Sequence, residues 1–309
     1  MAKKAKPFVK WIGGKTQLLS EINMILPKEL IQTDFTYVEP FVGGGAVLFH
    51  MLCNYPNMKK IVINDVNLDL INTYKTIANN HKELILILKE LEREFHDLEE
   101  DEENKQIYYY DKRTLYNSKT ENKLNQSALF IFLNKTCFNG LYRVNQKGEF
   151  NTPIGRYKKP TICDDANICV VNEILQNVEI LNGDFEQTLK YANPNSLFYF
   201  DPPYKPINES SNFTEYTKGG FNDSEQIRLR DFCIQLHKLG HTWILSNSDV
   251  KKQYESNSFF DDLYKDFTIK SVLAKRTINA NANRRGNVSE LLITNQTREQ
   301  LNERGEYEF

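Results

Sequence analysis

The chain has 309 residues, of which 40% are hydrophobic and 26% charged, and its formal net charge is −2. This balance is typical of a folded globular protein, and contact with a polyanion would therefore require a local basic surface. The longest aliphatic run, residues 84–88, is too short to span a bilayer, and no signal peptide is expected. Five cysteines without a C-x-x-C pair argue against a disulfide framework, so we expect a cytoplasmic protein. No metal site is predicted, because His237 and His241 lack a third ligand nearby.

The first predicted elements alternate between strand and helix. Residues 35–39 (FTYVE) form a strand, the glycine turn PFVGGG follows, and residues 46–52 (AVLFHML) form a helix. Residues 60–64 (KIVIN) form a second strand, and Asn67 caps the helix that comes next. This β-α-β-α order is typical of a parallel sheet.

The pattern then changes to a long helical region. Residues 82–135 are predicted to be mainly helical, with the acidic run 97–103 (DLEEDEE) as a solvated helix end or loop. Residues 136–160 are rich in Asn, Gly, Lys and Arg, a composition that indicates a loop.

Strands return after this region. We predict a helix at about residues 223–239 and an antiparallel pair formed by the last two strands. The predicted strands are 178–181, 196–200, 241–246, 266–273 and 288–294.

The fold class that follows is α/β, with a Rossmann-like, mainly parallel sheet interrupted by a mainly helical insert. Residues 1–69 and 166–309 form the main domain in this interpretation, and residues 70–165 form the insert.

The glycine turn and an acidic residue after the second strand indicate a site for an adenosine-type ligand. Gly43 and Gly45 permit a tight turn that brings backbone N–H groups to a helix N-terminus. Asp65, at the end of the next strand, can accept hydrogen bonds from ribose hydroxyls. An NAD site is disfavoured because Leu48 stands where the third glycine should be, and Val9 stands where a P-loop leading to GGKT needs glycine.

The tetrapeptide DPPY at 201–204 follows a buried strand, where open α/β sheets place their sites. Pro202 and Pro203 stiffen the backbone and remove two N–H donors, so nearby carbonyls lack competing donors. The Asp201 carboxylate and the Pro202 carbonyl can each accept an N–H of a planar amine such as adenine N6, and Tyr204 can stack on the base. The alternative is a plain turn that ends the strand.

In this order, the motifs resemble the DNA adenine methylase (Dam) family, which includes the DpnII-type modification enzymes. The resemblance covers nearly the whole chain. The motifs are KWIGGK at 10–15, EPFVGGG at 39–45, INDVN at 63–67, FNGLYRVNQKGEFNTPIGRYKKP at 138–160, GDF at 183–185, DPPY at 201–204 and RTINANANRRGNVSELL at 276–292.

The resemblance implies an adenine-N6 DNA methyltransferase that uses S-adenosyl-L-methionine and acts on double-stranded DNA by base flipping. The catalytic residues implied are Asp201, Pro202, Pro203 and Tyr204. The cofactor residues implied are Trp11, Lys15, Glu39, Gly43, Gly45, Asp65, Asp184, Phe185 and Asp201. The main domain is then the catalytic domain, and the insert is the DNA target-recognition domain.

The insert is expected to read the DNA, with GATC as the target usual in this branch of the family. Arg143 can make a bidentate contact to guanine, whereas Arg156, Lys158 and Lys159 are placed to contact phosphates. The DNA-binding residues implied are Lys10, Phe138, Asn139, Leu141, Arg143, Pro153, Arg156 and Lys158. Solvation explains Lys158 and Lys159 equally well.

Two alternatives remain at this level. One is an N-methyltransferase that acts on RNA or on a protein amide, and the other is a non-catalytic DNA-binding module of the same fold. A functional pairing with a restriction endonuclease is compatible with the first interpretation, and no membrane partner is expected.

Overall fold

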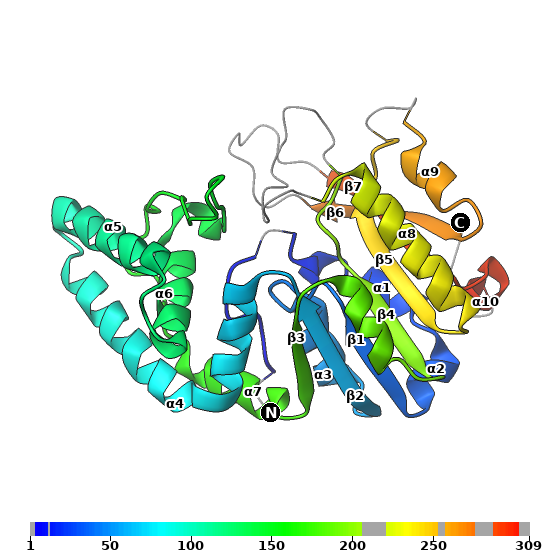
Figure 1. The fold of residues 1–309 in the computed structure, drawn as a ribbon, viewed down its shortest axis with the longest axis horizontal. Coiled ribbons are helices and arrows are strands. Elements are labelled where there is room, and N and C mark those ends of the chain that lie inside the picture. Colours follow the sequence, from blue (N-terminus) through cyan, green and yellow to red (C-terminus); the bar gives the residue numbers. More distant parts are fainter. Residues whose placement is uncertain (1–3, 12, 206–220, 253–256, 276–286, 303–309) are drawn as a thin grey trace.

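The computed structural model describes residues 4–11, 13–205, 221–252, 257–275 and 287–302. At its centre lies a seven-stranded sheet in the order β3-β2-β1-β4-β5-β7-β6 (Figure 1). The strands are β1 (Phe35–Glu39), β2 (Met58–Asp65), β3 (Val178–Asn182), β4 (Ser196–Phe200), β5 (Thr242–Ser248), β6 (Thr268–Lys275) and β7 (Asn287–Thr294). Strands β1 to β5 are parallel, and β7 pairs antiparallel with both β5 and β6. The predicted α/β sheet and its antiparallel edge are confirmed.

Helices lie on both faces of this sheet, with α8 on one face and α1 to α3 on the other (Figure 1). No helix in the described part of the chain is long and apolar enough to cross a membrane. The helices are α1 (Leu19–Ile25), α2 (Lys28–Gln32), α3 (Ala46–Asn54), α4 (Leu68–Asp97), α5 (Glu102–Ser118), α6 (Lys123–Thr136), α7 (Asp165–Leu175), α8 (Asp223–Lys238), α9 (Phe259–Leu263) and α10 (Arg298–Asn302), with the short 3-10 helices η1 (Lys15–Gln17), η2 (Phe138–Gly140) and η3 (Phe185–Tyr191).

The strands are apolar on both sides, and the two sides belong to different cores. Val38 and Phe198 pack in the core that contains the buried face of α8. Their neighbours Tyr37 and Leu197 pack in the other core, together with α1 and α3. Side chains alternate between the faces of a strand, so buried runs such as SLFYF are expected where helices cover both faces.

Helices α4, α5 and α6 form an arm beside the sheet (Figure 1). The arm has no separate core, because Leu88, Phe95 and Phe132 belong to the same hydrophobic cluster as Tyr37 of the sheet. Helix α4 ends at Asp97 and α5 begins at Glu102, so the acidic run spans the end of one helix and the start of the next. The expected solvated helix end is therefore found.

The ends of the predicted insert, residues 70–165, lie close to the starts of α4 and α7. The division into two domains stays a prediction. The Asn67 side chain accepts a hydrogen bond from the backbone N–H of Leu70 at 3.0 Å, which confirms Asn67 as the N-cap of α4. Helix α4 then runs from the sheet into the arm, and α7 begins at Asp165.

A kink at Asn80 (φ −137°, ψ 35°) interrupts α4 where it enters the arm. The side-chain amide of Asn172 on α7 donates to the carbonyls of Ile77 and Ala78 at 2.9 and 2.8 Å. Gln176 adds a 2.9 Å hydrogen bond to the Ala78 carbonyl. Side chains of α7 and of its C-cap residue thus provide donors to carbonyls that the interrupted helix leaves without their usual partners.

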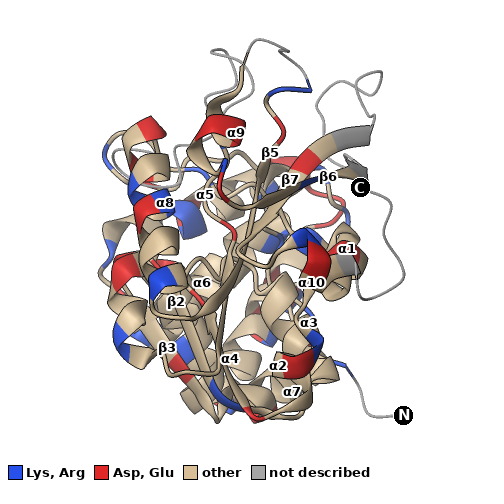
Figure 2. Ribbon diagram, turned by 90° about the vertical axis from the view of Figure 1, so that its right-hand side faces the viewer, with Lys and Arg blue, Asp and Glu red and all other residues tan. Residues whose placement is uncertain are grey.

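Charges of both signs are interspersed on the side of the molecule that carries α8, α9 and α10 (Figure 2). A mixed surface of this kind does not favour a polyanion.

Replacing Asn172 by Ala removes the donor shared by two carbonyls at the α4 kink. Loss of a partner from partly buried carbonyls costs about 1–3 kcal/mol, so we expect the free energy of unfolding in urea to fall by about that amount. Asn79→Ala is the control, because the exposed Asn79 amide donates only to Lys75 within the same helix. An equal loss in both variants would contradict this role of Asn172.

Candidate active site

Four carboxylates gather where neighbouring parallel strands end. Glu39 ends β1 and Asp65 ends β2, while Asp184 and Asp201 follow β3 and β4. The register pairs Asp65 with Asn182, the last residue of β3. The carboxyl ends of these strands form one edge of the sheet, which is where open α/β sheets bind ligands. The structure thus brings together acidic residues that the sequence offers in separate motifs.

The glycine turn after β1 packs closely against aromatic side chains. Gly43 and Gly45 have φ values of 48° and 77°, which glycine adopts without strain. A Cβ on Gly43 would lie 2.9 Å from the indole of Trp11, and one on Gly45 would lie 2.5 Å from the Tyr74 hydroxyl oxygen. The Gly43 N–H donates to Asp65, and the Gly45 N–H donates to the Val42 carbonyl. Packing and internal hydrogen bonds therefore require these glycines, and both N–H groups that were expected to face a ligand already have protein partners.

Backbone hydrogen bonds hold the Asp65 carboxylate in place. Its Oδ2 accepts from the Gly43 N–H at 3.0 Å and its Oδ1 from the Asn67 N–H at 2.9 Å. Burial raises the pKa of Asp65 to about 6, against the lowering effect of these hydrogen bonds. A carboxylate oxygen can accept more than one hydrogen bond, so Asp65 can still receive hydroxyl donors such as those of a ribose.

Glu39 is buried beside these groups. Its Oε2 accepts a hydrogen bond from the Tyr37 hydroxyl at 2.7 Å, and only 2% of the residue is exposed. Burial raises the pKa of Glu39 well above its ordinary value, and the nearby charges of Asp201 and Asp65 raise it further. This end of the sheet therefore favours a cation. No group of three or more His, Cys, Asp or Glu side chains in the described ranges is arranged to hold a metal ion.

The cation that the protein itself provides is Lys15. It is 4% exposed, and its Nζ lies 2.9 Å from Oδ1 of Asp201. Ser246 of β5 donates to the same oxygen at 3.1 Å. Burial raises the pKa of Asp201, whereas Lys15 lowers it and so favours the ionised carboxylate. The Lys15 ammonium also lies 4.5 Å from the centre of the Tyr204 ring, an attractive cation–π arrangement.

The segment after Asp201 is fastened by residues from distant parts of the chain. The Gln226 side chain donates to the Pro203 carbonyl at 3.1 Å, so this carbonyl does have a donor, contrary to expectation. The Tyr204 hydroxyl donates to Glu290 of β7 at 2.7 Å. Neither Gln226 nor Glu290 was singled out from the sequence, because their partners lie 23 and 86 residues away.

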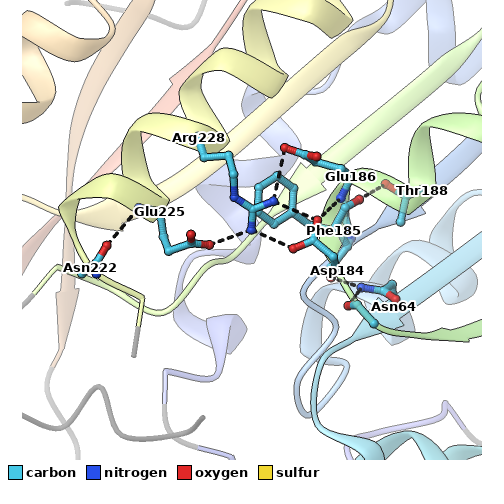
Figure 3. A network of polar contacts seen from close by, with 10 residues as sticks. Asn64, Asp184, Phe185, Glu186, Thr188, Asn222, Glu225 and Arg228 are labelled. Atoms are coloured by element: carbon cyan, nitrogen blue, oxygen red, sulfur yellow. Dashed lines mark hydrogen bonds and ion pairs between the residues drawn. The ribbon is translucent and has the colours of Figure 1, made fainter. Parts of the chain in front are cut away.

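Asp184 and Phe185 lie under a single arginine of α8 (Figure 3). The Arg228 guanidinium contacts Asp184 at 2.7 Å, Glu186 at 3.2 Å and Glu225 at 2.6 Å. It also covers the Phe185 ring, with its central carbon 4.3 Å from the ring centre. Arg228 holds the pKa of Asp184 below its ordinary value. These two implied cofactor residues are thus ordered by Arg228, which sequence reasoning missed.

The residues expected to bind DNA gather on an irregular hairpin after α6. Bridges join Cys137 to Ile154 and Val144 to Phe150, and we call residues 137–155 the recognition hairpin. The 3-10 turn η2, at its start, presents Phe138, a large apolar ring that is 45% exposed. The candidate residues on the hairpin are Phe138, Asn139, Leu141, Arg143 and Pro153.

Hydrogen bonds fix the shape of the recognition hairpin. Asn151 accepts from the exposed Arg143 guanidinium Nε at 2.7 Å and thereby orients it. The Leu141 carbonyl accepts from the Thr152 hydroxyl at 2.6 Å, and the Pro153 carbonyl accepts from the Phe138 N–H at 2.9 Å.

Basic side chains flank the recognition hairpin. Lys10, Arg156 and Lys158 are exposed, and the Lys10 ammonium lies 4.0 Å above the Tyr157 ring. Lys159, by contrast, forms a 2.6 Å ion pair with Glu99 of the acidic run. One acidic residue for which the sequence offered no role therefore neutralises a lysine considered for phosphate contact.

Trp11 connects the glycine turn to the hairpin. Its indole stacks on Tyr142 at 5.5 Å between ring centres, with 24° between the planes. Trp11 also packs closely against Gly43 and Gly44 of the glycine turn. The carboxylate-lined edge and the recognition hairpin are thus joined by aromatic packing.

The raised pKa of Asp65 makes a stability prediction. Because its pKa of about 6 in the folded chain exceeds the ordinary 3.8, the ionised form weakens the folded state above pH 6, and this effect disappears as the pH falls toward 4. Asp65→Asn should therefore increase the free energy of unfolding at pH 8 by up to ~3 kcal/mol, less the contribution of one lost backbone hydrogen bond. The melting temperature at pH 8 should rise accordingly. Calorimetric scans should show the gain shrink at pH 4, and a gain independent of pH would contradict this explanation.

Comparison with known proteins agrees with this geometry. Residues 11–278 match the family model described as D12 class N6 adenine-specific DNA methyltransferase. The Type II methyltransferase M.MjaIII of Methanocaldococcus jannaschii is 50% identical over 294 residues, which cover 94% of this chain and 99% of the relative. The Type II methyltransferase M1.LlaDCHI of Lactococcus lactis is 39% identical, over 94% of this chain and 95% of the relative.

A further relative is the DNA adenine methylase of Haemophilus influenzae, 34% identical over 94% of this chain and 93% of its own length. These matches confirm the resemblance inferred from the motifs and favour an enzyme that acts on DNA over the two alternatives. The chain belongs to the family of D12 class N6 adenine-specific DNA methyltransferases.

Proposed function

We propose that this enzyme transfers the methyl group of S-adenosyl-L-methionine to N6 of an adenine flipped out of a GATC site in duplex DNA. The observation that carries the proposal is the contact between buried Lys15 and Asp201 at the acidic edge of the sheet, directly before the two prolines. This contact favours the ionised form of a hydrogen-bond acceptor that we assign to a planar amine.

The acidic edge is chemically suited to this cofactor. S-adenosylmethionine supplies a methyl group on a positively charged sulfur, and buried carboxylates stabilise positive charge. Asp65 retains acceptor capacity for ribose hydroxyls, and we assign the adenine to the edge formed by Asp184 and Phe185, as the resemblance implies. The proposed cofactor residues are Trp11, Lys15, Glu39, Gly43, Gly45, Asp65, Asp184, Phe185 and Asp201.

The protein groups that orient the target amine are Asp201 and Pro202. The Asp201 carboxylate accepts one N6–H and the Pro202 carbonyl accepts the other, which directs the nitrogen lone pair toward the methyl donor and stabilises charge developing on nitrogen. Pro203 stiffens the same segment, and its carbonyl is held by Gln226. Lys15 favours the ionised form of the Asp201 carboxylate, against the opposing effect of burial, and the scheme uses no metal.

Base flipping explains how the target reaches this corner. An adenine inside a duplex cannot enter it, and extruding the base costs roughly a few kcal/mol, which aromatic stacking partly offsets. We assign this stacking to Tyr204, whose ring lies beside Lys15 and whose hydroxyl is held by Glu290.

The recognition hairpin is the proposed reader of the site. Asn151 holds the Arg143 guanidinium, and we assign to Arg143 the bidentate contact that best distinguishes guanine. Phe138 is exposed at the turn, where an apolar ring can enter a base stack opened by flipping. Lys10, Asn139, Leu141 and Pro153 complete the proposed base contacts, and Arg156 and Lys158 contact phosphates. Residues 70–165 then serve as the target-recognition part, with residues 1–69 and 166–309 as the catalytic part.

Digestion of plasmid DNA tests the target and the base together. Plasmid from cells that lack GATC methylation but express this chain should resist an endonuclease that is blocked by N6-methyladenine in GATC. Plasmid carrying the Asp201→Ala gene should be cut. Full cutting of both plasmids would contradict the GATC proposal. A functional pairing with a restriction endonuclease stays a prediction, which a search of the neighbouring genes for a GATC-cutting activity would check.

The Asp201→Ala enzyme separates chemistry from DNA binding. Removal of a group that stabilises developing charge lowers turnover by about 10²- to 10³-fold or more. Duplex affinity, measured by fluorescence anisotropy, should remain close to that of the wild type because the phosphate contacts lie elsewhere. Asp223→Ala is the control, since this exposed carboxylate pairs with Lys205 next to the same segment. Normal turnover by Asp201→Ala would refute the mechanism.

A further inference from the structure

Asn134, at the end of α6, is buried to 1% exposure although its side chain is polar. Its Oδ1 accepts from the backbone N–H of Lys10 at 2.7 Å, and its Nδ2 donates to the Lys10 carbonyl at 2.8 Å. The same Nδ2 donates to the carbonyl of Gly140 at 3.1 Å. One side chain therefore bonds to both backbone groups of Lys10 and to the η2 turn at the start of the recognition hairpin.

The two segments joined by Asn134 are in direct contact. Gly140 has φ +65°, and a Cβ there would lie 2.4 Å from Cβ and 2.6 Å from Cδ of Lys10. The Lys10 stem therefore lies directly on the η2 turn, and its ammonium lies over the ring of Tyr157, two residues after the recognition hairpin. Small changes in the turn must move Lys10, because side chains packed this closely do not slide independently.

The residues on either side of this contact are the proposed base-reading groups. Lys10 comes from the N-terminal segment that leads to Trp11 and Lys15, whereas Leu141 and Arg143 follow Gly140 in the recognition hairpin. Reading a base edge requires hydrogen-bonding groups held to within about 0.5 Å of their productive positions. The buried Asn134 side chain, which bonds to both segments, can hold the base-reading groups this closely.

We infer that Asn134 is a positioning residue for target recognition. It holds Lys10 and the recognition hairpin in a fixed relative position and thereby determines how strictly the enzyme distinguishes its target sequence. The inference rests on the proposed function of the hairpin. Asn134 itself is buried and acts through the residues that it holds.

The chain contains a matched control for the Asn134 hydrogen bonds. Asn167 of α7 accepts from the Lys6 N–H at 3.0 Å and donates to the Lys6 carbonyl at 2.9 Å. Asn134 and Asn167 therefore hold the same N-terminal segment in the same way, but only Asn134 also holds the recognition hairpin. A loss that arises from loosening the segment alone would appear in both variants.

The experiment compares Asn134→Ala and Asn167→Ala with the wild type. The preferred sequence of the wild type is first read from methylated plasmid DNA, and kcat/KM is then measured on a short duplex with that sequence and on duplexes with one altered base pair. Melting temperatures and calorimetric affinity for S-adenosylmethionine are measured for each protein.

We expect Asn134→Ala to lower the ratio of cognate to altered-site kcat/KM by about 10-fold or more, the usual contribution of one good base contact. Affinity for S-adenosylmethionine should be unchanged, and Asn167→Ala should keep the wild-type ratio. Asn134→Asp provides a second test should the alanine variant fold poorly. It keeps the volume and the acceptor but turns a carboxylate toward two carbonyls, and it should also lose discrimination.

Equal discrimination ratios in the two asparagine variants, or an unchanged ratio in Asn134→Asp, would overturn the inference. A wild-type preference for a sequence other than GATC would contradict the proposed target alone, because the comparison is then made on that other sequence. Absence of any methylation by the wild type would overturn both proposals.

Discussion

The buried ion pair between Lys15 and Asp201 is the interaction on which the rest of the site depends. Parallel strands deliver several carboxylates to one edge of the sheet, and burial makes Glu39, Asp65 and Asp201 harder to ionise. The Lys15 ammonium lies 2.9 Å from the Asp201 carboxylate, and Lys15 is 4% exposed. Its positive charge stabilises the ionised carboxylate against the effect of burial. A buried charge that loses its partner is strongly destabilising, so neither residue can be exchanged without consequences for the other.

Around this pair, the protein uses side chains from many elements to hold a few short segments. Gln226 of α8 holds the Pro203 carbonyl, Glu290 of β7 holds the Tyr204 hydroxyl, and Arg228 of α8 orders Asp184 above Phe185. Such supporting groups restrict the positions of the residues that would meet a ligand. A site that requires precise geometry depends on this support as much as on the residues in contact with the ligand.

The connection between the sheet and the arm follows the same principle. The two share a continuous hydrophobic core, and Trp11 packs between the glycine turn and Tyr142. Asn134 adds directional hydrogen bonds to Lys10 and Gly140. These bonds fix the relative position of the two segments more narrowly than apolar contacts do. Under the proposed function, these contacts keep the reading surface and the reaction site in one alignment.

Much of the architecture was determined by local patterns in the sequence. Buried strands such as residues 35–39 and 196–200, the capping Asn67 and the helix of about residues 223–239 follow from side-chain periodicity and turn chemistry, which act over a few residues. The motifs also identified the family correctly, because DPPY and the glycine turn carry their chemistry in neighbouring residues.

Only the tertiary structure decided which residues support these motifs. The partners of Asp184, Pro203 and Lys10 lie on helices far away in the chain, and no local pattern marks an arginine or an asparagine as a partner. The glycine turn shows the same limit, since its N–H groups were expected to face a ligand and instead bond to Asp65 and Val42. Hydrogen-bond partners are chosen by distance and direction in space, and folding alone brings these groups together.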